Sequence, residues 1–196
     1  MHGYQMNFPV SDNSILFVHS IGPFTEAELN VIEQYGDSLP MKKAPLGGDA
    51  EGGAYDHKRI TRVGSIGHTP ENAWIYDRVG EAAVALNRFY KFDLSGFTEQ
   101  IQYLAYDGEE HSHFNWHVDQ NPFAVPRKLS LTLQLTDPSE YEGCDLQFFA
   151  GQNVESAPRA RGVLVAFPSY VLHRVSPIVS GTRKAIVAWV SGPQFK

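Results

Sequence analysis

Apolar and polar positions alternate with helical spacing in two stretches of the first half of the chain. In the first stretch, Thr25 and Glu28 have the spacing of a capping box, in which the threonine oxygen and the glutamate carboxylate bind free backbone amides of the first helical turn. Phe24 and Leu29 occupy the positions of a hydrophobic staple across the same turn. This pattern predicts a helix from about Thr25 to Tyr35.

A second helix is predicted to open at Thr69 and Pro70, because proline is favoured in the first helical turn. After it, apolar residues recur at steps of three and four, with charged residues on the opposite face. Such spacing indicates one apolar stripe that lies in the core. Its members are Ile75, Val79, Ala82, Leu86 and Phe89.

From Thr98 onward the pattern changes to short runs rich in β-branched and aromatic residues, separated by Gly, Pro, Asn and Asp. The runs are IQYLAY, FNWHVD, LSLTLQLT, DLQFF, GVLVAFP, LHRVSPIV and RKAIVAWV. Short strands at this spacing predict a sandwich or a barrel. Together with the two preceding helices, they predict a mainly β fold of the α+β class.

The run LSLTLQLT alternates strictly between apolar and polar side chains. Its leucines share one face of the predicted strand, and Ser130, Thr132, Gln134 and Thr136 share the other. If the helices cover the leucines, the polar face looks into the barrel. Buried hydroxyls and amides cost free energy unless they are hydrogen-bonded, so a polar interior indicates a cavity for a ligand or cofactor.

Composition narrows the class of protein. The chain has 196 residues and a formal net charge of −6, without a dense Lys/Arg stripe, so we expect no nucleic-acid partner. A lone cysteine, Cys144, cannot form an intrachain disulfide, and the polar start resembles no secretory signal. We therefore expect a cytoplasmic protein without a membrane segment. It should form one domain over residues 1–196, with helical support over about 1–97 and a β core over about 98–192.

Met41–Tyr55 contains four glycines and few apolar residues, which is typical of a loop. It reads either as a passive connector or as a lid over a site. The segment HKRITRV follows it, and its basic residues Arg59 and Arg62 are expected to share one face and to help receive a substrate.

Three residues form the candidate metal site. His117 and Asp119 stand two apart in a strand-like segment, which would place both side chains on one face. His173 follows the apolar run GVLVAFP, where a late strand of a closed barrel can return beside an early one. Two imidazoles and one carboxylate leave metal positions open, which suits non-haem iron(II) better than structural zinc.

Arg183 opens the run RKAIVAWV shortly after His173. Its planar guanidinium could bind a dicarboxylate bidentately inside the barrel. An isolated arginine would more simply lie on the surface, but the spacing from His173 favours the buried role.

Three segments together resemble the 2-oxoglutarate/Fe(II)-dependent oxygenases, in their prolyl 4-hydroxylase-like branch with bacterial and phage members. They are QYLAYDGEEHSHFNWHVDQ, RKLSLTLQLTDPSEYEGCDLQFF and RGVLVAFPSYVLHRVSPIVSGTRKAIVAWVSG. The resemblance covers about residues 100–192. It implies a double-stranded β-helix, a jelly-roll whose N-terminal helices pack outside the larger sheet.

The resemblance also implies roles for individual residues. It makes His117, Asp119 and His173 the iron ligands, and it makes Arg183 the anchor for the distal carboxylate of 2-oxoglutarate. Two further contacts with the co-substrate are implied at Tyr106 and Gln134.

The chain departs from the family pattern at two positions. Phe114 stands where many relatives have tyrosine, and Cys144 replaces the second glycine of a Gly-Gly turn. Neither residue belongs to the implied set of iron ligands. Trp189 is expected to pack and could also wall the cavity.

The implied activity is hydroxylation of an unactivated C–H bond with release of succinate and CO2. It needs Fe(II), 2-oxoglutarate and O2, with ascorbate as a further candidate cofactor. A prolyl residue in a peptide or protein is the first substrate hypothesis, and a small molecule is the second. The alternative is a non-redox cupin-like or lectin-like jelly-roll that binds metal or sugar, which would leave Arg183 unexplained.

Overall fold

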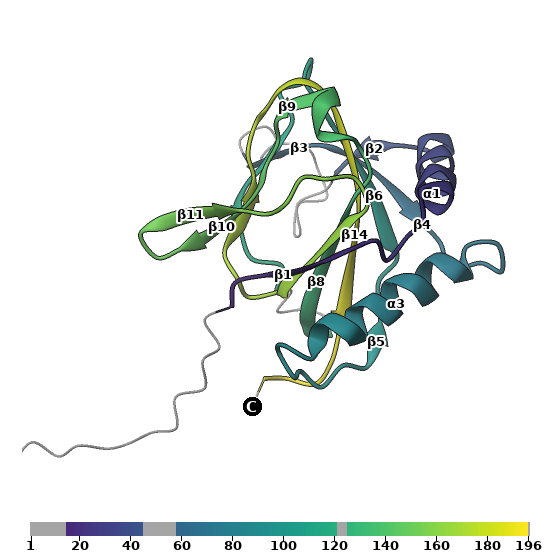
Figure 1. The fold of residues 1–196 in the computed structure, drawn as a ribbon, viewed down its shortest axis with the longest axis vertical. Helices are drawn as coiled ribbons and strands as arrows, with labels where there is room; N and C mark the ends of the chain where they lie inside the picture. Colours follow the sequence, from purple (N-terminus) through teal and green to yellow (C-terminus); the bar gives the residue numbers. More distant parts are fainter. Residues whose placement is uncertain (1–14, 45–57, 121–124, 196) are drawn as a thin grey trace, which may run out of the picture.

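The computed structural model describes residues 15–44, 58–120 and 125–195. Within these ranges, two α-helices and a short 3-10 helix, η1 (Pro138–Glu140), lie alongside two antiparallel sheets (Figure 1). The helices are α1 (Glu26–Ser38) and α3 (Ala73–Asn87). Among the described residues, no helix is both long and apolar enough to cross a membrane.

The larger sheet has the strand order β1-β12-β8-β14-β6-β4-β2, and β5 and β9 pair with β14. Its strands are β1 (Val18–Ile21), β2 (Lys42–Lys43), β4 (Arg62–Ile66), β5 (Gly96–Phe97), β6 (Ile101–Asp107), β8 (Arg127–Gln134), β9 (Tyr141–Gly143), β12 (Val163–Pro168) and β14 (Ile178–Ser191). The smaller sheet has the order β11-β10-β13-β7-β3. Its strands are β3 (Arg59–Ile60), β7 (His113–His117), β10 (Leu146–Ala150), β11 (Asn153–Ser156) and β13 (His173–Val175).

Two apolar layers follow from this arrangement. One lies between the helices and the larger sheet, where Leu129, Leu131 and Leu133 of β8 pack with Ile32 of α1 and Val79 of α3. The other lies between the two sheets. The polar residues of β8 face the second layer, so the alternation along β8 has the predicted direction. The fold is mainly β with helices outside the larger sheet, as predicted (Figure 1).

The predicted helices are present with shifted ends. Thr25 and Glu28 form the expected capping box, and α1 extends beyond Tyr35 to Ser38. The start of the second helix was predicted too early, because residues 70–72 form a turn closed by a hydrogen bond from the Asn72 amide to the Thr69 carbonyl.

Phe89 was wrongly assigned to the core stripe. It lies beyond the end of α3 and is 40% exposed. The helix ends at Asn87, whose side chain accepts a hydrogen bond from the Phe92 amide and donates one to the Phe92 carbonyl. These side-chain bonds hold the chain in a reversal that helical geometry would not allow.

The segments LHRVSPIV and RKAIVAWV divide differently from the prediction. The first splits into β13 and the start of β14, and the second belongs to that same long strand β14. Arg59 and Arg62 do not share a face, because Arg59 lies in β3 of the smaller sheet and Arg62 in β4 of the larger sheet. Arg62 is half exposed and pairs with Glu110. Most of the proposed lid, residues 45–55, lies outside the described residues.

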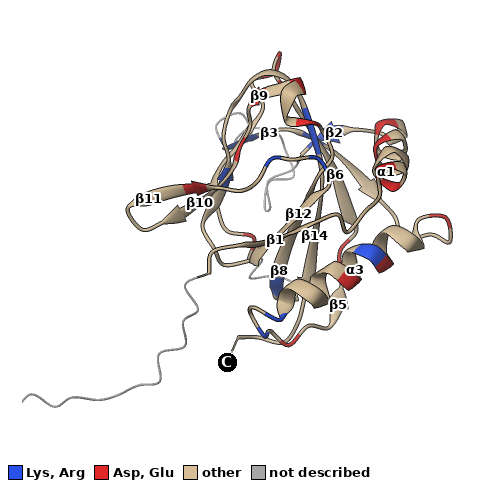
Figure 2. Cartoon of the chain, in the orientation of Figure 1, with Lys and Arg blue, Asp and Glu red and all other residues tan. Residues whose placement is uncertain are grey.

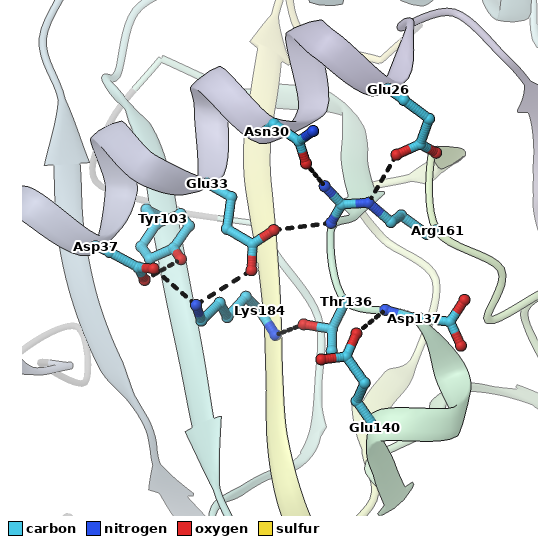
Figure 3. A network of polar contacts seen from close by, with 10 residues as sticks. All are labelled: Glu26, Asn30, Glu33, Asp37, Tyr103, Thr136, Asp137, Glu140, Arg161 and Lys184. Carbon is cyan, nitrogen blue, oxygen red and sulfur yellow. Dashed lines mark hydrogen bonds and ion pairs between the residues drawn. The ribbon is translucent and has the colours of Figure 1, made fainter.

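Ion pairs connect helix α1 to the larger sheet. Acidic residues are frequent on this helix (Figure 2), and the side chain of Arg161, just before β12, contacts three of its residues. The Arg161 guanidinium donates to Glu26 at 3.1 Å, to Asn30 at 2.8 Å and to Glu33 at 2.8 Å (Figure 3). Because one planar group satisfies three partners on successive turns, it fixes the helix axis relative to the sheet.

Lys184 of β14 makes a second connection to α1. Its Nζ donates to Glu33 at 3.1 Å and to Asp37 at 2.8 Å, and Asp37 also accepts from the Tyr103 hydroxyl at 2.7 Å (Figure 3). Successive side chains of a strand point to opposite faces. With Lys184 held on the helix side, its neighbour Arg183 points between the sheets.

Two helical glycines give a matched test of this packing. A Cβ on Gly36 of α1 would lie 2.3 Å from ring carbons of the buried Tyr103, whereas a Cβ on Gly80 of α3 would lie 3.7 Å from Phe97. Replacing glycine by alanine inside a helix normally stabilises by about 0.8–1.0 kcal/mol, but overpacking costs about 1–3 kcal/mol. We therefore expect Gly36→Ala to lower the free energy of unfolding by about 1–2 kcal/mol.

Gly80→Ala is the control and should raise the free energy of unfolding by about 0.5–1 kcal/mol, because its new methyl group meets only an ordinary contact. Urea denaturation of both variants measures the two signs. If Gly36→Ala instead raises the free energy of unfolding, α1 does not pack closely against Tyr103 in solution.

Candidate active site

The three candidate metal ligands converge through strand pairing. In β7 and β13, which are antiparallel neighbours, His117 and His173 lie directly opposite each other. This cross-strand pairing brings together two residues that are far apart in the chain. Together with Asp119 they offer ligand atoms that all lie within 4.8 Å of one another.

Asp119 reaches this position differently from the prediction. Strand β7 ends at His117, so Asp119 lies in the following loop and its side chain is not placed by strand alternation. The Asp119 amide donates to the Ser169 carbonyl at 2.8 Å. This hydrogen bond holds the loop close to the two histidines. Its carboxylate oxygens each lie 3.6 Å from one imidazole Nε2, Oδ1 from that of His117 and Oδ2 from that of His173.

Both imidazoles are oriented for binding through Nε2. The Nδ1 atom of His117 lies 2.7 Å from the Asn115 carbonyl, and that of His173 lies 2.9 Å from the Val171 carbonyl. A carbonyl only accepts, so we assign the proton to Nδ1 in each ring, which leaves the Nε2 lone pair for a metal. Such carbonyl contacts are the usual support of metal-binding histidines.

The electrostatics of the cluster also suit a cation. Burial, together with the neighbouring His173, lowers the pKa of His117 to about 4, so this ring is neutral near pH 7. Burial alone would raise the pKa of Asp119, but the two histidines and hydrogen bonds from Ser130 and Trp189 hold it below its ordinary value. The site therefore offers two imidazole nitrogens and one anionic oxygen donor, a donor set that fits ferrous iron.

A frame of polar residues orients Asp119. The Ser130 hydroxyl donates to its carboxylate at 2.7 Å and is itself bonded to the Ser169 hydroxyl at 2.9 Å. Arg127 donates to the Asp119 carbonyl at 3.1 Å and lies 3.9 Å from the Trp189 ring centroid. Arg127 was not predicted from the sequence, because nothing in the motif distinguishes it from a surface arginine.

Arg183 lines the same cavity as the three candidate ligands. It is 2% exposed, and its Nε and Nη2 donate to the Gln134 side-chain oxygen at 3.2 and 2.8 Å. Guanidinium groups stay charged even when buried, so the cavity contains a fixed cation that a carboxylate could neutralise. Gln134 itself is not among the lining residues, and its contact is with Arg183.

Tyr106 and Trp189 also line the cavity. Tyr106 lies opposite Arg183 in the pairing of β6 with β14, and the guanidinium lies 5.4 Å from its ring centroid. Burial raises the pKa of Tyr106, so its hydroxyl stays protonated and can donate a hydrogen bond. Arg183 and Tyr106, both named from the sequence, thus lie beside each other in the cavity wall.

Cys144 packs against the same guanidinium. It is fully buried, its Sγ lies 4.0 Å from Arg183 Nη1, and its backbone has a φ of 57°. This left-handed conformation favours glycine, so a cysteine is strained at this place. Burial raises the pKa of Cys144, so the thiol stays protonated.

Phe114 is the second departure, and it touches the candidate metal site. Its ring stacks on His117 with centroids 3.5 Å apart and an interplanar angle of 14°. The guanidinium of Arg59, a residue of β3, lies 4.6 Å from the centroid of the Phe114 ring. Arg59 lines the cavity, whereas Arg62 does not.

Known proteins with similar sequences include oxygenases and hydroxylases. Residues 101–191 match the model of the 2OG-Fe(II) oxygenase superfamily. A PKHD-type hydroxylase of Synechococcus sp. (strain CC9902) is 43% identical over 79 residues, which cover 39% of this chain and 35% of that protein. The chain thus spans about a third of the length of this curated relative.

Solved structures show the same fold over nearly the whole chain. A Pseudomonas putida prolyl-4-hydroxylase superposes with a TM-score of 0.70 at 16% identity, covering 91% of this chain and 93% of that one. A Trichoplax adhaerens prolyl hydroxylase, in complex with a hypoxia inducible factor peptide fragment, gives 0.69 at 17% identity, covering 90% and 83%.

Proposed function

We propose that the protein is a 2-oxoglutarate- and Fe(II)-dependent hydroxylase, because residues 101–191 match the model of the 2OG-Fe(II) oxygenase superfamily. One observation carries the proposal: a cavity that combines two imidazoles and a carboxylate with a buried arginine. A non-redox jelly-roll that binds metal or sugar has no need of that arginine.

The residues have distinct roles in this proposal. His117, Asp119 and His173 hold the iron and leave positions for other ligands. Arg183, steadied by Gln134, binds the distal carboxylate of 2-oxoglutarate, and the Tyr106 hydroxyl donates a hydrogen bond beside it. Iron and 2-oxoglutarate supply the activation of O2, with one oxygen atom entering the hydroxylated product and the other entering succinate as CO2 leaves.

The apolar part of the cavity wall serves the same reaction. Leu104, Leu146, Phe167 and Val187 line the space between the two sheets. Such a wall excludes water and leaves the polar groups to orient the co-substrate.

An anaerobic titration tests the class of enzyme. Adding 2-oxoglutarate to the iron(II)-loaded protein should produce a weak visible charge-transfer band, since the chelating keto acid and ferrous iron must share one site. Admitting O2 should then produce succinate. Absence of the band, together with tight zinc binding, would support the non-redox alternative.

The substrate is the finer part of the proposal. A prolyl residue in a peptide is the candidate, in line with the names of the two structural neighbours. Peptides that differ by a single Pro-to-Ala replacement test it, with mass spectrometry detecting the gain of one oxygen atom. Equal oxidation of both peptides would exclude the prolyl ring as the target.

A further inference from the structure

Thr132 is the middle one of three polar side chains on the inner face of β8. Ser130 and Gln134 lie two residues away on either side of it. The Ser130 hydroxyl donates to the Asp119 carboxylate at 2.7 Å. The Gln134 side-chain oxygen accepts from the Arg183 guanidinium. Because alternate residues of a strand point to the same face, Thr132 faces the space between the candidate metal site and the candidate carboxylate anchor.

The Thr132 hydroxyl makes no hydrogen bond with the part of the chain that the structure describes. The polar contacts on this face of β8 involve Ser130 and Gln134 instead. Thr132 is 6% exposed and lines the cavity. A polar group that is buried without a partner costs free energy, so its presence here needs a reason.

Packing does not supply that reason. In the strand pairings, Thr132 lies opposite Val165 of β12 and Val187 of β14. Val165 is buried in the apolar layer between the sheets, and Val187 lines the cavity. Valine has the shape of threonine with a methyl group in place of the hydroxyl, so a third valine would fill this row equally well. The hydroxyl adds a hydrogen-bond donor that a ligand in the cavity can use.

Resting on the proposed hydroxylase function, we propose that the Thr132 hydroxyl donates a hydrogen bond to the keto-acid end of 2-oxoglutarate. The co-substrate has to reach from Arg183 to the metal ligands, and successive residues on this face of β8 are about 6.6 Å apart. Between its two ends 2-oxoglutarate has only methylene groups, which accept no hydrogen bond. With the distal carboxylate assigned to Arg183, the keto acid is the acceptor that remains for Thr132.

Thr132→Val tests the proposal, because it removes the hydroxyl and keeps the shape of the side chain. Anaerobic titration of the iron(II)-loaded variant should give a dissociation constant for 2-oxoglutarate at least tenfold above that of the native protein. At saturation, the charge-transfer band should lie at shorter wavelength, since a hydrogen bond makes the keto acid a better electron acceptor. Thr132→Ser restores a hydroxyl and should keep both values close to the native ones.

The melting temperature of the metal-free protein separates a ligand contact from a structural one. Because the hydroxyl has no partner among the described residues, metal-free Thr132→Val should melt at or above the native temperature. Thr182→Val is the matched control. Thr182 lies directly before Arg183 in the neighbouring strand β14, so its side chain points to the opposite face. This control should bind 2-oxoglutarate as the native protein does.

The proposal is overturned if Thr132→Val binds 2-oxoglutarate as tightly as the native protein, or if Thr182→Val weakens binding equally. An unmoved band in saturated Thr132→Val would show that the hydroxyl does not contact the keto acid. A lower melting temperature of metal-free Thr132→Val would make the hydroxyl a structural group. If the native protein itself gives no band, the hydroxylase function fails, and this proposal fails with it.

Discussion

Replacing Asp119 with alanine is expected to abolish iron(II)-dependent conversion of 2-oxoglutarate to succinate. Asp119 is the one anionic group among the three candidate ligands, and two imidazoles alone hold ferrous iron weakly. Loss of a group that merely supports a metal ligand already costs about 10–100-fold in affinity or activity, so loss of the ligand itself should cost more than about 100-fold. Succinate formation and iron binding at equilibrium measure both effects.

The Asp119→Ala protein should remain folded. Its partner Ser130 keeps a hydrogen bond to the Ser169 hydroxyl, so the substitution leaves no buried hydroxyl without a partner. His113→Ala is the control, because this histidine lies on the same strand β7 but its Nδ1 contacts the His111 carbonyl and it is not part of the cluster. Full turnover in a folded Asp119→Ala protein would remove Asp119 from the proposed ligand set.

The sequence predicted the strands that carry the site better than the pairing between those strands. Alternation in β8 correctly indicated which face is polar and which packs against the helices, because burial on one side leaves a period of two. The pairing of β7 with β13 could not be derived from spacing alone, since it depends on how the whole sheet closes. The return of a late strand beside an early one was predicted from a closed barrel, but the register that sets His117 opposite His173 was not.

The wrong predictions concern places where contacts outside a helix or strand decide where that element ends. The Asn87 side chain ends α3 early and leaves Phe89 exposed, although the helical spacing continues through Phe89. Arg59 and Arg62 separate because the chain passes from the smaller sheet to the larger one at Thr61, whose hydroxyl donates to the Ala105 carbonyl. The pattern of apolar and polar residues in this segment does not indicate that the chain passes from one sheet to the other.

Substitution of Arg183 is expected to have the second large effect, on co-substrate affinity. A hydrogen bond to a charged group contributes about 1.5–3 kcal/mol, so Arg183→Ala should raise the dissociation constant of 2-oxoglutarate by tenfold or more. Iron binding should persist, because Arg183 is not a member of the ligand cluster. Anaerobic titration of 2-oxoglutarate into the iron-loaded variant measures the change.

Two further variants separate the anchor from general effects of charge and packing. Arg183→Lys keeps the charge but loses the planar fork that Gln134 orients, so it should also bind 2-oxoglutarate more weakly than the native protein. Lys184→Met removes a neighbouring positive charge from the opposite face of β14, where Lys184 contacts Glu33 and Asp37, and should leave the affinity unchanged. If Arg183→Ala binds 2-oxoglutarate as tightly as the native protein, the carboxylate anchor must be another residue. Arg59, the other cationic residue that lines the cavity among those described, would then be the first to test.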